Sequence, residues 1–197
     1  MGLFYDYGEL LSKNGNINFL IGGRGCGKTF GFKEWAIRDF LKTKKQFVYL
    51  RRYKEELAKI STFFVDIQAE GLFPKAEFKV EGGKNGAKFY VNNQCCGYAA
   101  ALSSQVTLKS VPFNNVNKLC FDEFLLEKSH YSYLPNEPFY FMNIIETVSR
   151  LRIGKPLKEQ LRVFAIGNPT SIVNPYFDYF NIYFNPMKRF DIYDFKG

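Results

Sequence analysis

The sequence predicts an α/β fold in which helices cover both faces of a mostly parallel sheet. Short apolar strands alternate with segments of helical periodicity, and a glycine-rich turn joins the first strand to the first helix. Between residues 77 and 98 the apolar period changes to two, which is typical of a small β-hairpin insertion. Alternation favours parallel strands, because each helix returns the chain to the same edge of the sheet.

The first predicted elements are an apolar strand at Ile17–Ile21 and a helix from Lys28 to about Lys42. A second buried strand follows at Gln46–Leu50. Residues 54–70 predict one amphipathic helix, whose apolar face is formed by Leu57, Ile60, Phe64 and Ile67.

The hairpin at about residues 77–98 turns where Asn85-Gly86 supplies a favoured turn dipeptide, and we expect an insertion beside the main sheet. Residues 103–117 are polar and predict a loop, and Lys118–Phe121 predicts a short strand. The remaining predicted elements are a helix over 138–152, strands at 161–166 and 189–193, and an aromatic core segment near 176–184. We expect one domain over residues 1–197.

The composition is that of a folded, basic protein. Of 197 residues 46% are hydrophobic and 18% aromatic, and 27 Lys and Arg against 19 Asp and Glu leave a net charge of +8. This excess favours a polyanionic partner, or serves solubility alone. The sequence has neither a basic signal-peptide start nor the roughly 20-residue apolar run of a membrane helix. We therefore expect an intracellular protein that is not secreted and has no membrane partner.

Cysteine spacing excludes two further classes. Cys26, Cys95, Cys96 and Cys120 show no C-x-x-C pattern, and His130 is the only histidine. A zinc site is therefore not expected, and the thiols are predicted to be free. We expect His130 to be a loop residue without a catalytic role.

Residues 22–29 match the phosphate-loop pattern G-x-x-x-x-G-K-[ST] between a predicted strand and a predicted helix. In this context backbone N–H groups surround a phosphate. Lys28 is expected to reach the β- and γ-phosphates, and the Thr29 hydroxyl to bind Mg²⁺. The nucleotide-binding residues are predicted to be Gly22, Gly23, Arg24, Gly25, Cys26, Gly27, Lys28 and Thr29.

Two acids, Asp122 and Glu123, follow the strand at 118–121. Parallel strands deliver such side chains to the same sheet edge as the phosphate loop. Asp122 is expected to hold Mg²⁺, and Glu123 to polarise a water that attacks the γ-phosphate. The pair favours hydrolysis over a small-molecule kinase, which must exclude water. A GTPase is disfavoured, because the segment Asn117–Cys120 ends in Cys where the guanine-binding N-K-x-D pattern needs Asp.

Other polar residues have two interpretations each. Arg150 or Arg152 is either an arginine finger for a neighbouring subunit or a basic end to its helix. Asn168 is either a sensor of water or phosphate, or part of an Asn-Pro turn. Candidate contacts to nucleotide or DNA phosphates, or else solvated cations, are Arg51, Arg52, Lys54, Lys84 and Lys109. A DNA-binding module that uses ATP without hydrolysing it therefore also stays open.

A longer series of segments resembles the DNA-packaging ATPases of phi29-like bacteriophages. The matching segments are residues 22–29, 47–54, 56–59, 121–124, 127–128, 135–137, 173–177 and 188–190. They occur in the same order over nearly the whole chain. Cys26 departs from an aliphatic position of that family, which is tolerable because only its backbone faces a phosphate.

The resemblance implies a P-loop ATPase of the additional-strand, catalytic-glutamate (RecA-like) type, with ATP and Mg²⁺ as cofactors. It implies a homo-oligomeric, pentameric ring on the portal of a procapsid, with procapsid RNA as a partner, which drives double-stranded DNA inward in the host cytoplasm. It favours Arg150 as the finger and supports the roles of Asp122 and Glu123. Such proteins continue into a C-terminal nuclease-like domain, which we expect this chain, ending at Gly197, to lack.

Overall fold

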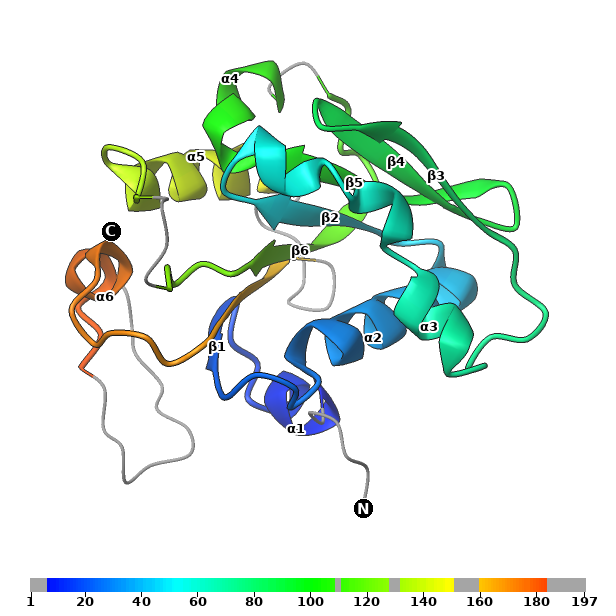
Figure 1. Cartoon of the computed structure of the whole chain (residues 1–197), viewed down its shortest axis with the longest axis horizontal. Helices are drawn as coiled ribbons and strands as arrows, with labels where there is room; N and C mark the ends of the chain where they lie inside the picture. Colours follow the sequence, from blue (N-terminus) through cyan, green and yellow to red (C-terminus); the bar gives the residue numbers. More distant parts are fainter. Residues whose placement is uncertain (1–6, 109–110, 128–131, 151–159, 184–197) are drawn as a thin grey trace.

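The computed structural model of the chain describes residues 7–108, 111–127, 132–150 and 160–183. Its sheet has seven strands in the order β1-β7-β6-β2-β5-β4-β3 (Figure 1). Neighbouring strands from β1 to β5 are parallel, whereas β4 is antiparallel to both β5 and β3. The predicted mixed, mostly parallel α/β sheet is confirmed. The predicted strand at 189–193 lies outside the described residues.

The strands are β1 (Ile17–Ile21), β2 (Gln46–Arg51), β3 (Phe78–Gly83), β4 (Gly86–Val91), β5 (Gln94–Ala101), β6 (Val116–Asp122) and β7 (Arg162–Gly167). The helices are α1 (Tyr7–Ser12), α2 (Lys28–Thr43), α3 (Val65–Ala69), α4 (Gln105–Leu108), α5 (Glu137–Ser149) and α6 (Pro175–Phe180). Three short 3-10 helices are η1 (Lys54–Leu57), η2 (Ile60–Thr62) and η3 (Leu102–Ser104). Helix α1 was not predicted, and α4 and the start of β6 lie within the expected 103–117 loop.

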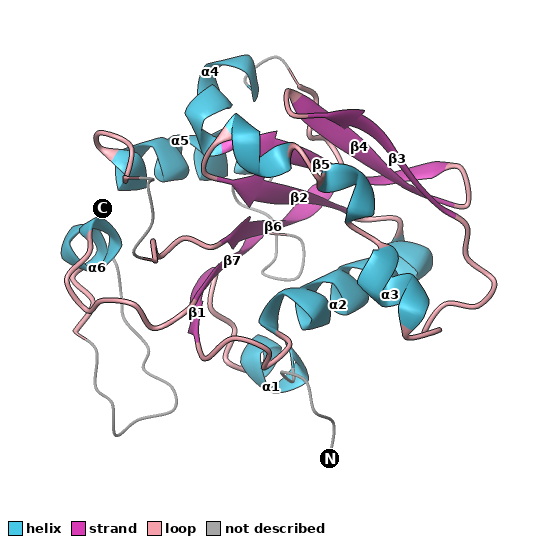
Figure 2. Cartoon of the chain, in the orientation of Figure 1, coloured by secondary structure: helices cyan, strands magenta, loops and turns pink. Residues whose placement is uncertain are grey.

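Helices cover both faces of the sheet, as predicted. Helices α1 to α3 lie on one side and α4 to α6 on the other (Figure 2). Successive side chains of a strand point to opposite faces, so Phe47 packs with Phe32 of α2, whereas Val48 joins the core around Phe141 of α5. In the described part of the chain, no helix is long and apolar enough to cross a membrane.

The single helix predicted for residues 54–70 is wrong, because this segment forms η1, η2 and α3. Its predicted apolar face is nevertheless buried. At the second break, between η2 and α3, Lys33 Nζ lies 2.7 Å from the Phe63 carbonyl oxygen and 2.9 Å from Asp66 Oδ2. This ammonium occupies a carbonyl that a continuous helix would use for its own i+4 bond.

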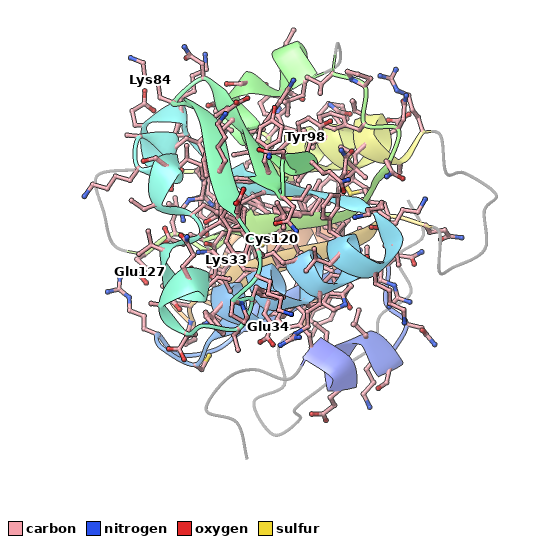
Figure 3. All side chains as sticks on the ribbon, turned by 90° about the vertical axis from the view of Figure 1, so that its right-hand side faces the viewer. Lys33, Glu34, Lys84, Tyr98, Cys120 and Glu127 are labelled. Carbon is pink, nitrogen blue, oxygen red and sulfur yellow. The ribbon has the colours of Figure 1, made fainter. Side chains whose placement is uncertain are left out.

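The strands of residues 77–98 lie within the main sheet rather than beside it. Strand β5 pairs with both β4 and β2 and so joins the hairpin to the parallel strands. The first turn lies one residue earlier than predicted, at Lys84–Asn85, because Gly83 pairs with Gly86. Lys84 is exposed at the outer end of this hairpin (Figure 3). The second turn has Asn92 and Asn93 with φ of 52° and 59°, which is typical of a type I′ hairpin.

Gly97 is where the hairpin meets the parallel strands, and it tolerates no side chain. A Cβ there would lie 2.7 Å from the backbone oxygen of Phe47. We expect Gly97→Ala to lower the free energy of unfolding by about 1–3 kcal/mol, because β5 and β2 must move apart. Urea denaturation measures the change. The control Gly83→Ala, where a Cβ meets nothing within 4 Å, should change stability by less than about 0.5 kcal/mol. Equal losses in both variants would contradict this packing argument.

Candidate nucleotide site

The glycine-rich loop connects β1 to α2 at the carboxyl edge of the parallel strands. Gly25 and Gly27 have φ of 78° and 76°, a conformation that favours glycine. Gly22, in contrast, provides space: a Cβ there would lie 3.3 Å from Cys26 Sγ. The loop ends at the N-terminus of α2, whose first turn holds no acidic residue, so free N–H groups and the helix dipole favour an anion.

Lys28 is buried and its ammonium lies inside this loop. Its Nζ donates to the carbonyl oxygens of Gly22 at 2.6 Å and Gly23 at 2.8 Å, and to Asn168 Oδ1 at 3.3 Å. The end of β7 thus brings Asn168 to the loop, as the sensor interpretation requires. Asn168 Nδ2 in turn donates to Glu127 Oε1 at 2.6 Å.

Glu127 continues this chain of contacts to the surface. It forms an ion pair with Arg24 of the loop, and the hydrogen bonds from Arg24 and then Asn168 hold the pKa of its carboxyl below the usual range. Sequence reasoning did not predict a site role for Glu127, because its partners are 103 and 41 residues away. The chain Arg24–Glu127–Asn168–Lys28 ties the loop to the segments after β6 and β7.

Asp122 is buried at the end of β6, and both of its carboxylate oxygens accept hydrogen bonds. Thr29 Oγ1 donates to Oδ1 at 2.9 Å, and the Tyr49 hydroxyl donates to Oδ2 at 2.6 Å. Burial first, and then Asp122, raise the pKa of Tyr49 well above its usual value, so the hydroxyl stays a donor. The Thr29 hydroxyl and the Asp122 carboxylate are hard oxygen donors of the kind Mg²⁺ prefers, and they fit such an ion.

Glu123 projects from the turn that follows Asp122. Its backbone is left-handed, with φ of 59°, and its side chain is 58% exposed. Arg51, at the end of β2, places Nη2 at 2.6 Å from Glu123 Oε2 and 2.9 Å from Glu56 Oε1, while its Nη1 lies 3.5 Å from Asp122 Oδ2. The Arg51 side chain is 15% exposed, so its guanidinium pairs with Glu56, Asp122 and Glu123 and is not displayed at the molecular surface.

The other residues predicted to contact phosphates differ in how far they are buried. Arg52 is 1% exposed and paired with Glu137, so a DNA contact by Arg52 is wrong. Lys54 is half-buried and Lys84 exposed. Arg150 is exposed and follows the last residue of α5. Lys109, His130 and Arg152 lie outside the described residues.

The four cysteines are free, as predicted. Cys26 lies in the loop, with Sγ 3.1 Å from the Gly23 carbonyl oxygen. Cys120 is buried in β6, inside the molecule in Figure 3, and burial raises the pKa of its thiol well above the usual value. Among the described residues no cluster of His, Cys, Asp and Glu could hold a metal by itself.

Strand β1, the glycine-rich loop and helix α2 form a strand–loop–helix unit in a seven-stranded α/β sheet, with Asp122 and Glu123 at the end of β6 beside it. The model of the family "Podovirus DNA encapsidation protein (Gp16)" matches residues 1–196. The chain belongs to this family, and the resemblance inferred from the sequence is confirmed.

Individual relatives agree with this assignment. The chain is 41% identical over 192 residues to the DNA packaging proteins of Bacillus phages PZA and phi29, which covers 98% of this chain and 54% of each relative. It therefore spans about half the length of these relatives. A crystal structure of the N-terminal domain of the phi29 DNA packaging ATPase has a TM-score of 0.86, with 39% identity over 98% of this chain and 94% of that chain. A chain of the phi29 packaging motor assembly has a TM-score of 0.83 and 40% identity, covering 98% and 56% of the two chains.

Tyr49 is a site residue that sequence reasoning missed, and it can be tested. Removing its hydroxyl leaves Asp122 Oδ2 without this donor, so we expect Tyr49→Phe to raise the Mg²⁺ concentration for half-maximal nucleotide hydrolysis about tenfold. A Mg²⁺ titration at fixed nucleotide measures the change. The control Tyr90→Phe, on the distant strand β4, should leave the requirement unaltered. An unchanged Mg²⁺ requirement in Tyr49→Phe would remove Tyr49 from the site.

Proposed function

We propose that the chain is the ATPase domain of a viral DNA-packaging motor, which uses ATP hydrolysis to move double-stranded DNA into a procapsid. The observation that carries this proposal is the contact of Thr29, in the phosphate loop, with Asp122, directly before Glu123. It joins a triphosphate-binding loop to a candidate water-activating carboxylate. Two phi29 relatives of known structure, a DNA packaging ATPase and a chain of a packaging motor assembly, support the coupling to DNA.

In the proposed mechanism each site residue has a separate task. Lys28 and the N–H groups of the loop bind the β- and γ-phosphates. Thr29 and Asp122 would hold Mg²⁺, which neutralises phosphate charge when bound. Glu123 accepts a hydrogen bond from the attacking water and draws its proton away, while Asn168 contacts the same phosphate region through Lys28. In this structure Arg51 forms an ion pair with the Glu123 carboxylate. This ion pair must break before the carboxylate can accept a hydrogen bond from water.

Strand order supports the additional-strand, catalytic-glutamate type. Strand β7 lies between β1, which leads to the phosphate loop, and β6, which leads to Asp122. Glu123 directly follows the proposed metal-binding acid, Asp122, an arrangement that suits activation of a water beside the γ-phosphate. A small-molecule kinase is the weaker alternative, because the Glu123 side chain is more than half exposed to water.

An apolar cavity of about 170 Å³ is the proposed site of the adenine base. Its lining includes Ile21, which directly precedes the loop, and Pro169, which directly follows Asn168. Leu125, Ile172 and Phe177 add apolar surface for a flat ring. The position beside the loop supports a bound nucleotide whose phosphates lie at Lys28.

The partners are proposed from the relatives as well. They are a homo-oligomeric, pentameric ring, the portal of a procapsid, procapsid RNA and double-stranded DNA, all in the cytoplasm of the host cell. Lys54, Lys84 and Lys109 remain the proposed DNA contacts; the exposed position of Lys84 supports its assignment.

Two substitutions test the roles of the central residues. We expect Lys28→Ala to lose ATP binding, and Glu123→Gln to bind ATP normally but turn it over at least about 10²-fold more slowly. Phosphate release and nucleotide titration measure the two effects. The control Lys42→Ala removes an exposed cation at the end of α2 and should leave both unchanged. Wild-type turnover in Lys28→Ala or Glu123→Gln would overturn the assignment.

The arginine finger is tested by mixing inactive subunits. Arg150→Ala subunits retain Glu123, and Glu123→Gln subunits retain Arg150, so activity should return at mixed interfaces if Arg150 acts in trans. In the control, Arg150→Ala is mixed with the double variant Arg150→Ala/Glu123→Gln, which has no finger to supply. Absence of recovery at every mixing ratio would argue against a trans role.

A further inference from the structure

Behind the exposed Glu123 lies a buried polar cluster that the proposed mechanism does not use. Arg52, Glu137 and Tyr176 are each at most 1% exposed. Arg52 Nε lies 3.0 and 2.9 Å from the two carboxylate oxygens of Glu137. Glu137 also accepts hydrogen bonds from the Tyr176 hydroxyl at 2.5 Å and from the Leu134 backbone N–H at 2.8 Å. The charge of Glu137 is therefore fully paired and hydrogen-bonded.

The rest of the Arg52 guanidinium holds the backbone of the turn that carries Glu123. Nη1 donates to the carbonyl oxygen of Glu123 at 3.1 Å, and Nη2 donates to that of Phe124 at 2.6 Å. The guanidinium also lies between aromatic rings, 5.1 Å from the centroid of Tyr133 and 5.6 Å from that of Phe121. Rings and hydrogen bonds together leave this planar group little freedom to turn.

The turn needs such support, because its conformation is unfavourable. A non-glycine residue with φ of 59° costs about 1–2 kcal/mol relative to the right-handed region. The Phe124 N–H donates to the Ile166 carbonyl oxygen at 3.0 Å. Arg52 binds the carbonyl oxygen of that same peptide, which belongs to Glu123, and that of the next peptide, which belongs to Phe124. These contacts determine the direction in which the Glu123 side chain leaves the backbone.

We propose that Arg52, oriented by Glu137, is a positioning residue that fixes the backbone of Glu123 for hydrolysis. This inference rests on the proposed ATPase function. Two consecutive arginines thus hold the same glutamate in different ways: Arg51 binds its carboxylate and Arg52 its carbonyl oxygen. Glu137 is also the first residue of α5, so the same ion pair anchors the helix that ends next to Arg150.

A structural role alone does not account for an arginine in this place. Replacing a buried ion pair by apolar residues of similar size is often neutral or stabilising, since desolvation offsets the attraction. An apolar pair in this cluster would fill the space but could not bind the two carbonyl oxygens, and it would leave the Tyr176 hydroxyl and the Leu134 N–H without their acceptor. Stability and turnover therefore respond differently to such a replacement, and that difference separates positioning from packing.

The test compares the full chain with the double variant Arg52→Met/Glu137→Leu in thermal unfolding, ATP binding and ATP turnover. We expect a folded protein, an ATP Kd within about threefold of wild type and a kcat at least about tenfold lower, because the Glu123 carboxylate is misplaced. The matched control Arg38→Gln/Glu34→Gln removes an exposed ion pair on α2 and should change none of the three.

A folded double variant with wild-type kcat would overturn the inference. If that variant does not fold, Arg52→Lys decides: its single ammonium keeps a charge near Glu137 but cannot also reach both carbonyl oxygens, so kcat should fall with Kd unchanged. Wild-type kcat in a folded Arg52→Lys would equally exclude positioning by Arg52. Absence of turnover in the wild-type chain would instead contradict the proposed function, so the two failures are distinguishable.

Discussion

The parallel pairing of β1, β7, β6 and β2 is the constraint on which the candidate site depends. Because these strands run in one direction, their carboxyl ends meet at a single edge, and each delivers polar residues there. Strand β1 leads to the phosphate loop, β7 to Asn168, β6 to Asp122 and Glu123, and β2 to Arg51 and Arg52. A strand inserted antiparallel among them would remove one of these contributions and leave its partners unpaired.

Charge inside the molecule is balanced more closely than the net charge of +8 indicates. Several buried cations are paired with acids: Arg52 with Glu137, Lys33 with Asp66 and Lys118 with Asp39. Arg51 likewise neutralises the carboxylates that gather beside the phosphate loop. The basic excess open to a polyanion therefore belongs to other positions, such as the hairpin tip at Lys84. Under the proposed function, such exposed cations would attract a DNA backbone without reading its sequence.

At the same edge of the sheet, side-chain contacts also connect the candidate nucleotide site to neighbouring segments and to helix α5. The Arg24–Glu127–Asn168–Lys28 chain joins the loop to the segments after β6 and β7, and the Arg52–Glu137 pair joins the Glu123 turn to α5. In a ring, the end of α5 with Arg150 would face a neighbouring subunit under the proposed function. In the proposed ring, contacts of this kind would connect the site of one subunit to that of the next.

The sequence alone determined the features that depend on neighbouring residues: the strand, loop and helix around Lys28, the acids Asp122 and Glu123 at the end of a strand, and the order of most elements. Local pattern sufficed there, because a phosphate loop needs only a few consecutive residues of the right type. Tertiary structure decided the roles of Tyr49, Arg52 and Glu127, whose partners lie 41 to 103 residues away. It also divided residues 54–70 into three short helices, the last of which begins two residues after Phe63, whose carbonyl oxygen Lys33 binds. Periodicity predicts which face of an element is buried, but not which distant polar group lies against it. These contacts are necessary because burying a polar group without a hydrogen-bond partner costs free energy.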